Sequence, residues 1–220
     1  MAIKPILFNT EMVRAILDGR KTCTRRLVKP QPDEKHTYPL GFVTDSTEKK
    51  EVGCFGFGID EYGGSIKYVK APYQPGDTLY VRETWMDYAG LTMYKADCDI
   101  YRLDSLNFAG FGWKPSIHMP KEAARIWLKV TDVRVERLQE ITEDGAKNEG
   151  AKQCYEQINT IENKPVTYLA DDNRGYYVLG FKKVWNSTIK KSDLDRYGWN
   201  ANSWVWVIEF ERCEKPTEMR

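Results

Sequence analysis

The residues best suited to chemistry lie in one basic segment near the start of the chain, residues 19–26, with the sequence GRKTCTRR. Within eight residues this segment carries four cationic side chains, two hydroxyl groups and one thiol. Guanidinium and ammonium groups bind phosphates and other anions, so such a cluster suits a nucleotide or an RNA. A charged strand that faces solvent is the alternative, and the number of charges does not decide between the two.

The thiol of Cys23 has cationic neighbours, which favour the reactive thiolate form. No histidine accompanies it in sequence, so we expect Cys23 to be a bystander. The cysteines are odd in number, widely spaced and never in a C-x-x-C pair: Cys23, Cys54, Cys98, Cys154 and Cys213. This pattern argues against a disulfide framework and a zinc site, and free thiols are expected. With only two histidines in addition, we expect no metal and no organic cofactor.

The composition is that of an ordinary globular chain of 220 residues, 41% hydrophobic and 30% charged. Its 33 basic and 32 acidic side chains nearly cancel, so the whole molecule has no field that captures nucleic acid non-specifically. Any contact with nucleic acid must come from a local patch. No apolar run reaches the roughly 18 to 20 residues of a membrane helix, and the first residues lack a signal-peptide pattern, so we expect a cytosolic protein without membrane contact.

A short helix must position the basic segment. Apolar residues at helical spacing predict this helix up to residue 17, with Asn9 or Thr10 as its cap and Gly19 as its stop. If the following residues are extended, Lys21, Cys23 and Arg25 point to one side, and residues 22, 24 and 26 to the other.

The rest of the chain alternates strand and helix patterns. Strands are predicted at 78–85, near 93–96, at 126–138 with a phase slip at 131–132, and at 203–213. Shorter β-like runs are predicted at 53–59 and 65–69. Helices are predicted from a Thr142 cap toward residue 157, and over 176–188. Short helices among twisted strands favour an α+β fold, a small mixed β-barrel with helices closing its ends.

The spacing Gly19-x-Lys21-x-x-Thr24-x-Arg26 resembles the G-x-K-x-x-x-x-R signature of the ASCH superfamily, relatives of the PUA RNA-binding domain. Residues 75–81, 138–150 and 207–210 resemble three further family segments in the right order. The resemblance implies a PUA-like β-pseudobarrel in a single domain, 1–213, followed by a flexible tail, 214–220. The common core would comprise residues 3–27, 73–85, 126–150 and 203–213. The insertions would comprise residues 28–72, 86–125 and 151–202.

Small ASCH enzymes similar to this chain hydrolyse the acetyl group of N4-acetylcytidine, and their catalytic residues correspond to Lys21, Thr24 and Glu149. A desolvated lysine can take the proton of a threonine hydroxyl, which then attacks the amide carbonyl. Glu149 would protonate the leaving amine or orient water, and Arg26 or backbone amides would stabilise the oxyanion. Each residue has an alternative role. Lys21 can contact a phosphate, Thr24 can be an ordinary buried strand residue, and Glu149 can face solvent.

Further ligand-binding residues are expected beside the basic segment, namely Gly19, Arg20 and Arg26, together with Tyr80, Arg82, Glu83 and Trp85 on strand 78–85. These strand residues can stack on a base and bind its edge. The alternative is an aromatic-rich sheet surface that packs against the inserted segments, and we favour it. The cluster of Trp199, Trp204 and Trp206 is expected to be core or to pack against the insertions, and no function is assigned to it.

The first hypothesis is therefore an ASCH protein that binds RNA or a modified nucleoside, with amidohydrolase activity on a cytidine-type substrate. The chain has about twice the length of the smallest family members, and resembles the longer branch found in phage and prophage. A non-catalytic RNA-binding module is one rival hypothesis, and a phage regulatory or assembly protein is another. The sequence does not predict an oligomeric state.

Overall fold

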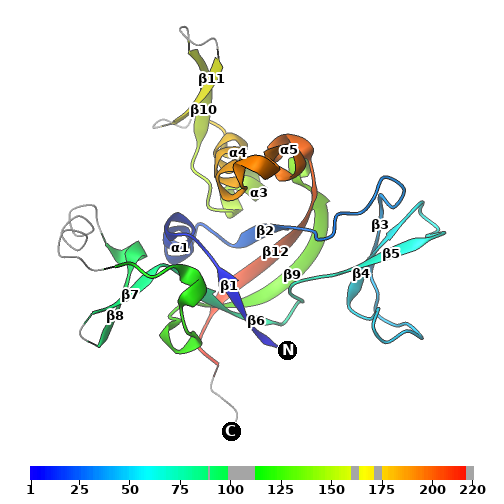
Figure 1. Ribbon diagram of the computed structural model, residues 1–220, viewed down its shortest axis with the longest axis horizontal. Helices are drawn as coiled ribbons and strands as arrows, with labels where there is room; N and C mark the ends of the chain where they lie inside the picture. The colour runs from blue at the N-terminus through cyan, green and yellow to red at the C-terminus, as the bar shows by residue number, and fades with distance from the viewer. Residues whose placement is uncertain (89, 99–111, 160–163, 171–174, 217–220) are drawn as a thin grey trace. The chain divides into compact units, whose positions relative to one another are not determined.

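The computed structural model describes residues 1–88, 90–98, 112–159, 164–170 and 175–216. The fold is mixed α+β, with most strands in several sheets and few helices (Figure 1), as the sequence predicts. Contacts divide the chain into two compact units. The first comprises Met1–Thr22, Pro75–Thr131 and Phe210–Arg220, and the second Cys23–Gln74 and Asp132–Glu209. The single domain 1–213 stays a prediction.

The described strands form four sheets, and no closed barrel is found among them. The strands are β1 (Ile3–Leu7), β2 (Cys23–Leu27), β3 (Tyr38–Phe42), β4 (Cys54–Gly58), β5 (Ile66–Lys70), β6 (Thr78–Arg82), β7 (Trp85–Tyr88), β8 (Leu91–Tyr94), β9 (Trp127–Arg137), β10 (Cys154–Asn159), β11 (Lys164–Leu169) and β12 (Trp204–Cys213). The α-helices are α1 (Thr10–Leu17), α3 (Glu143–Asn148), α4 (Tyr177–Thr188) and α5 (Leu194–Tyr197). The 3-10 helices are η1 (Lys95–Asp97), η2 (Ser116–His118), η3 (Lys121–Ala123), η4 (Leu138–Glu140), η5 (Lys191–Asp193) and η6 (Trp199–Ala201).

In the first unit, β1 pairs in parallel with β6, and β6 pairs antiparallel with the start of β9. Leu79 and Val81 are fully buried while their neighbours on β6 are half-buried, so the predicted alternation is confirmed. The strand ends at Arg82 rather than at Trp85, because the chain there leaves this sheet and starts the β7–β8 hairpin. The predicted strand near 93–96 is β8, which begins two residues earlier.

Helix α1 confirms the prediction made from its caps. The side chain of Asn9 accepts a hydrogen bond from the backbone N–H of Met12, at 2.9 Å. The helix buries Val13 and Ile16, and Gly19 follows it with a φ of +73°, a conformation that glycine adopts without strain. Because α1 stops there, the basic segment leaves the helix as extended chain.

In the second unit, β12 pairs antiparallel with β2, as expected for a closing strand. Strands β1, β6, β9, β12 and β2 form one sheet in this order, and β9 and β12 each run from one unit into the other. The division of β9 falls between Thr131 and Asp132, at the predicted change of phase. The second unit has its own core, formed by Leu138, Ile141, Ala146, Ala151, Phe181, Trp185, Val205 and Val207.

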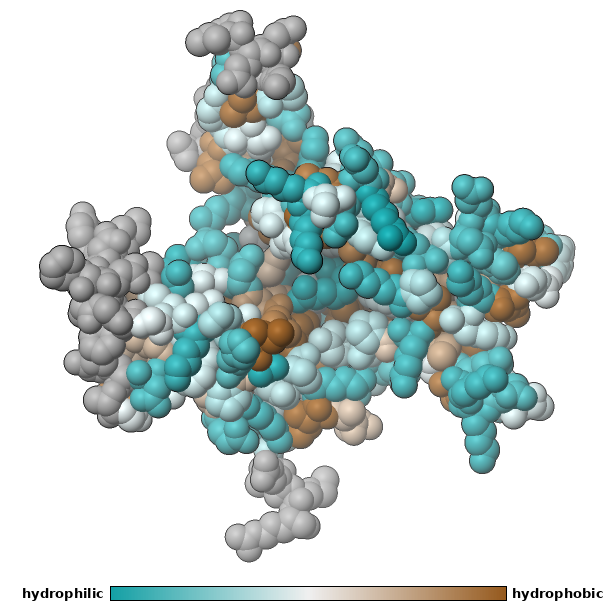
Figure 2. All heavy atoms as spheres, in the orientation of Figure 1, coloured by the Kyte–Doolittle hydropathy of each residue, from teal (hydrophilic) through white to brown (hydrophobic). Residues whose placement is uncertain are grey.

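The second unit also contains the sheet β3–β4–β5 (Figure 1). Phe55 of β4 packs edge-on against Trp206, with ring centroids 5.8 Å apart, and Phe57 packs against Trp204. These two tryptophans are therefore core, as expected. Strands β4 and β5 confirm the predicted runs 53–59 and 65–69, whereas β3 was missed because Pro39 and a glycine interrupt its pattern. Apolar and polar residues are mixed over this region of the surface (Figure 2).

The predicted helix toward residue 157 is wrong in its second half. Thr142 caps α3 as predicted, through a 3.0 Å hydrogen bond from the N–H of Gly145, but the helix ends at Asn148. Gly150 has a φ of +79° and reverses the chain, so the following residues form β10 and pair with β11 instead. The predicted helix 176–188 is confirmed as α4, which buries Phe181 and Trp185.

Helix α4 packs closely at Gly180, where a Cβ atom would overlap the backbone carbonyl of Lys152. An interior glycine replaced by alanine normally stabilises a helix by about 0.5–1 kcal/mol. Here we expect Gly180→Ala to destabilise the protein by about 1–3 kcal/mol in urea unfolding, because the helix must move away from that carbonyl. Lys183→Ala, at an exposed position of α4, should change stability by less than about 0.5 kcal/mol. Equal stability of the two variants would contradict this packing.

All five cysteines are free, as predicted, and four of them are buried. No helix among the residues described in the structure combines the length and the apolar content needed to cross a membrane. Of the predicted tail 214–220, residues 217–220 lie outside the described residues.

Candidate functional site

The basic segment is not a solvent-facing strand. Only 2% of Lys21, 2% of Thr24 and 5% of Arg25 is exposed. Burying a cationic group costs free energy unless neighbouring groups compensate its charge. Lys21 and Arg25 therefore need compensating neighbours, whereas the cations of a surface strand are solvated by water. The segment begins in the first unit and continues in the second from Cys23 onward.

Lys21 belongs to the first unit. Its backbone N–H donates to the carbonyl of Ala15 at 3.0 Å, which ties the chain to the end of α1. Its ammonium lies 5.4 Å from the ring centroid of Phe8, and that ring packs against Phe210. A cation over an aromatic face is stabilised by the quadrupole of the ring, which offsets part of the cost of burial.

The segment enters β2 in the second unit. Thr24 lies opposite Ile208 of β12, and Arg26 lies opposite Trp206. The thiol of Cys23 donates to the carbonyl of Gly145 at 3.9 Å, which suits the bystander role expected for it.

Glu149 is placed by the end of α3, where it is the C-cap. Its backbone N–H donates to the carbonyl of Gly145 at 3.1 Å, and the left-handed Gly150 then turns the chain away. The residue is only 7% exposed, so the alternative of a solvent-facing glutamate is wrong. A buried carboxylate at a helix end requires nearby cations or donors.

Arg25 supplies one such cation. Its Nη1 lies 3.5 Å from Oε1 of Glu149, and its Nη2 donates to Oε2 of Glu136 at 2.9 Å. The guanidinium lies 5.9 Å from the ring centroid of Phe181. Among the residues that the structure describes, Nε and Nη1 of Arg25 have no hydrogen-bond partner. Arg25 and Glu149 thus form a buried ion pair inside the second unit.

Arg26 and Tyr73 lie close enough to this ion pair to act on it electrostatically. Together the side chains form one polar group, which comprises Arg25, Arg26, Tyr73, Glu136 and Glu149. Burial lowers the pKa of Arg26, while the nearby Tyr73 and Glu149 act in the opposite direction. Burial likewise raises the pKa of Tyr73, and the charge of Arg26 opposes this. A guanidinium has an ordinary pKa far above 7, so Arg26 stays charged. The structure therefore brings two of the predicted site residues, Arg26 and Glu149, into one electrostatic group with Arg25.

The other two predicted residues of the basic segment, Gly19 and Arg20, lie in the turn that follows α1. Gly19 provides the left-handed residue after α1. Arg20 is exposed and forms an ion pair with Asp18, with 2.9 Å between Nη2 and Oδ2. Surface pairs of this kind contribute little stability, so Arg20 can be exchanged for a ligand contact at low cost.

The four residues predicted on strand 78–85 make internal contacts in the first unit. Tyr80 packs against Trp127, and Trp85 is buried with Met119, Ala124 and that same tryptophan. The Nε of Arg82 donates to the carbonyl of Met119 at 2.7 Å. Packing, the alternative favoured for the aromatic residues, therefore describes Tyr80 and Trp85.

Glu83 is the most deeply buried of these four, with 1% of its surface exposed. Its two carboxylate oxygens accept from Nε and Nη2 of Arg125, at 2.9 and 3.1 Å. Burial raises the pKa of Glu83, and Arg125 acts against it. This ion pair satisfies both oxygens of Glu83, which favours a structural role.

Sequence reasoning missed Arg25, Tyr73 and Glu136 as members of the polar group. For Arg25 a signal existed, because the expected strand phase puts it on the side of Lys21 and Cys23. For Tyr73 and Glu136 we find none, because each lies in a segment whose place beside β2 depends on the fold.

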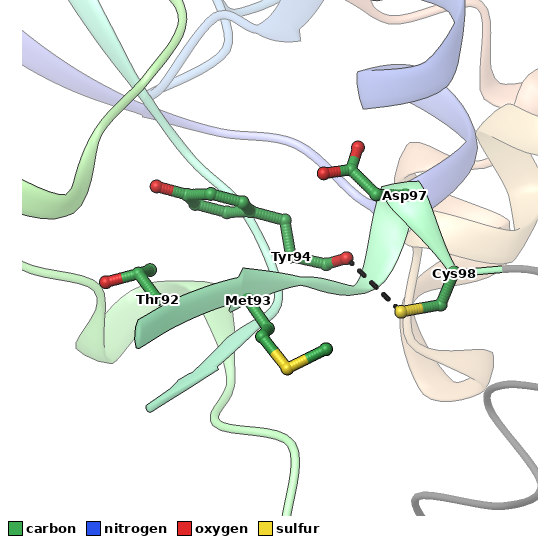
Figure 3. Close-up of a pocket in the computed structure, with 5 residues that line it drawn as sticks. All are labelled: Thr92, Met93, Tyr94, Asp97 and Cys98. Carbon is green, nitrogen blue, oxygen red and sulfur yellow. Dashed lines mark hydrogen bonds between the residues drawn. The ribbon is translucent and has the colours of Figure 1, made fainter. Parts of the chain in front are cut away.

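The first unit contains a cavity of about 230 Å³, whose lining residues are drawn in Figure 3. Its lining residues are Thr92, Met93, Tyr94, Asp97 and Cys98. The carboxylate of Asp97 accepts from Arg125 at 2.6 Å, and the thiol of Cys98 donates to the carbonyl of Tyr94 at 3.7 Å. Arg125 also stacks on the ring of Tyr94, with 3.9 Å to its centroid. The groups able to do chemistry here are already engaged by neighbours, so this cavity is a weaker candidate than the polar group around Glu149.

Comparisons with protein-family models, with curated proteins and with solved structures find no match to this chain. The resemblance to the ASCH superfamily therefore depends on the sequence motifs alone.

Proposed function

We propose that this chain is an ASCH-type protein that binds a modified nucleoside, free or within RNA, and hydrolyses an N-acyl group from a cytidine-type base. The proposal includes a PUA-like pseudobarrel as its fold and the bacterial cytoplasm as its site of action, for a chain of phage or prophage origin. Lys21, Thr24 and Glu149 are the proposed catalytic residues.

The observation that carries the proposal is the burial of an ammonium, a hydroxyl and a carboxylate at the three positions that the ASCH motifs assign to catalysis. Lys21, Thr24 and Glu149 are 2%, 2% and 7% exposed. Buried ionisable groups cost several kcal/mol unless they are compensated, so they are rare outside structural ion pairs and functional sites. Burial also supports a nucleobase rather than a phosphate backbone as the bound group, because backbone phosphates are contacted mainly by exposed cations.

In the proposed mechanism, Lys21 is the general base that takes the proton of the Thr24 hydroxyl, and the Thr24 oxygen attacks the acyl carbonyl carbon. Arg26 stabilises the oxyanion of the tetrahedral intermediate. The carbon–nitrogen bond then breaks, and Lys21 returns its proton to the leaving amine. Glu149 takes a proton from the water that hydrolyses the acyl-threonine and passes it to Thr24. In total, one amide and one water give one carboxylic acid and one amine.

Two roles were considered for Glu149, protonating the leaving amine and orienting water, and its surroundings favour the second. Its carboxylate is paired with the guanidinium of Arg25, and an ionised carboxylate accepts hydrogen bonds, such as those of a water molecule, and has no proton to donate. We therefore assign it to water activation and not to protonation of the leaving amine.

The test is incubation of the protein with N4-acetylcytidine and measurement of cytidine by chromatography. Lys21→Ala and Glu149→Gln should each lower the rate by about 10²–10⁴, the usual contribution of a general acid or base. Lys147→Ala and Glu140→Gln are matched controls, because both residues are exposed and lie outside the polar group. The proposal fails if no cytidine forms, or if the catalytic variants behave like these controls.

A further inference from the structure

The guanidinium of Arg25 has an arrangement that stability alone does not explain. Its side chain is 3% exposed, and it lies between Glu149 and Glu136, whose side chains are 5% and 23% exposed. A buried ion pair often contributes no more stability than apolar residues of the same volume. Phe181 beside the guanidinium shows that an apolar side chain would find packing partners at this place.

The hydrogen bonds of Arg25 are also incomplete. Within the described part of the chain, neither Nε nor Nη1 has a hydrogen-bond partner. A buried N–H group without a partner destabilises the folded state, because it has lost its hydrogen bonds to water. This position is therefore better explained by a functional role of Arg25 than by a contribution to stability. Its Nη1 faces the carboxylate of Glu149.

The surroundings fix Arg25 from two sides. Glu136 holds Nη2 at 2.9 Å, and its other oxygen accepts from Nε of Arg134 at 2.7 Å, so the anchor is itself held. On the other side lies Gly145 of α3, where a Cβ atom would stand 3.4 Å from Nη2, an ordinary contact distance.

From this geometry we infer that Arg25 is a positioning residue: anchored on Glu136, it holds the carboxylate of Glu149 in one orientation for the reaction. The inference rests on the proposed function, since it concerns how Glu149 acts there. It adds a residue for which the sequence motifs assign no role. Lysine cannot replace arginine in this position, because one ammonium lacks the planar fork that reaches two carboxylates at once.

The first test is the hydrolysis of N4-acetylcytidine by Arg25→Lys. We expect kcat to fall roughly 10- to 100-fold with KM changed less than about threefold, because a misplaced catalytic group slows the chemical step without removing substrate contacts. Arg137→Lys is the matched control. Arg137 belongs to the same unit and stacks on Trp204 at 4.2 Å, but no described contact links it to Glu149. Equal kcat values for the two variants would overturn the inference.

A second test does not depend on activity. Urea unfolding midpoints are measured for Arg25→Lys, Glu149→Gln and the double variant, which forms a double-mutant cycle. If Arg25 holds Glu149, Arg25→Lys lowers the midpoint less in the E149Q background than in the wild type. Equal shifts in both backgrounds would show that the pair is not coupled and would refute the positioning role.

The two tests separate the possible failures. If the wild type does not hydrolyse N4-acetylcytidine but the unfolding cycle shows coupling, the proposed function is refuted. Arg25 and Glu149 would then be a pair with a structural role only. Hydrolysis by the wild type without coupling would refute the role of Arg25 alone.

Discussion

Replacing Arg125 with methionine is expected to lower the free energy of unfolding by about 3 kcal/mol near neutral pH. The variant leaves the carboxylate of Glu83, 1% exposed, without the guanidinium that now binds both of its oxygens. Removing one partner of a buried ion pair usually costs about 3–5 kcal/mol, and the lower end applies because Arg125 itself is 26% exposed. Urea unfolding of both proteins at pH 7.5 measures the difference.

The difference in free energy of unfolding between Arg125→Met and the wild type should become smaller as the pH falls. Burial raises the pKa of Glu83 above 4.5, its ordinary value, and Arg125 opposes this, so the pKa rises further in the variant. A carboxyl with a raised pKa in the folded state binds protons more tightly there than in the unfolded state, so folding becomes more favourable as the pH falls through that range. The variant should therefore recover stability relative to the wild type between pH 7.5 and about 5.

Arg134→Met is the control for this pH dependence. Arg134 pairs with Asp132, Glu136 and Glu209, but its side chain is 41% exposed and these partners are at least partly exposed. We expect a loss below about 1 kcal/mol and no recovery at low pH. A deficit of Arg125→Met that is equal at pH 7.5 and pH 5 would mean that a buried charge on Glu83 is not its cause.

Replacing Thr24 with valine is expected to abolish the proposed hydrolysis, with a loss of roughly 10⁴-fold or more, because it removes the nucleophile. Valine has the shape of threonine and suits a strand. Thr24 is buried, and valine fills the same space at this position of β2. The unfolding midpoint should therefore stay near that of the wild type. Cytidine formation and urea unfolding, measured on the same preparation, test both parts.

Thr24→Ser separates the hydroxyl from the methyl group. Serine keeps the nucleophilic oxygen and should retain activity within about one order of magnitude, although its rotamer is less restricted. If valine and serine lower the rate equally, the oxygen of Thr24 is not the nucleophile. If valine leaves the rate unchanged, Thr24 is an ordinary buried strand residue.

Local signals in the sequence predicted much of the fold. The cap at Asn9 and the stop at Gly19 define α1, and strict alternation defines β6 and β12. The errors arose where one residue overrides the local pattern. Gly150 adopts a left-handed conformation and ends α3, so a strand replaces the expected second half of the helix. Strand β3 was missed since Pro39 is rare in the interior of sheets.

The candidate site was only partly predictable, because burial results from the fold. The motif identified Glu149, but nothing in residues 143–150 distinguishes a buried glutamate from a solvent-facing one. Arg25 belongs to the basic segment, yet its partner Glu136 is 111 positions away. Contacts over such separations leave no periodic signal in a single sequence, so the ion pairs of the site were found only in the structure.

The burial of the pair Arg25–Glu149 also determines how dissolved ions act on it. Mobile ions screen charges that face water over a Debye length of about 8 Å at physiological ionic strength, but they hardly reach a pair enclosed by protein. Exposed pairs such as Arg20–Asp18 weaken when salt is added, whereas the pair at the site keeps its strength. The electrostatics at Glu149 are therefore set mainly by the protein itself and depend far less on ionic strength than those of exposed pairs.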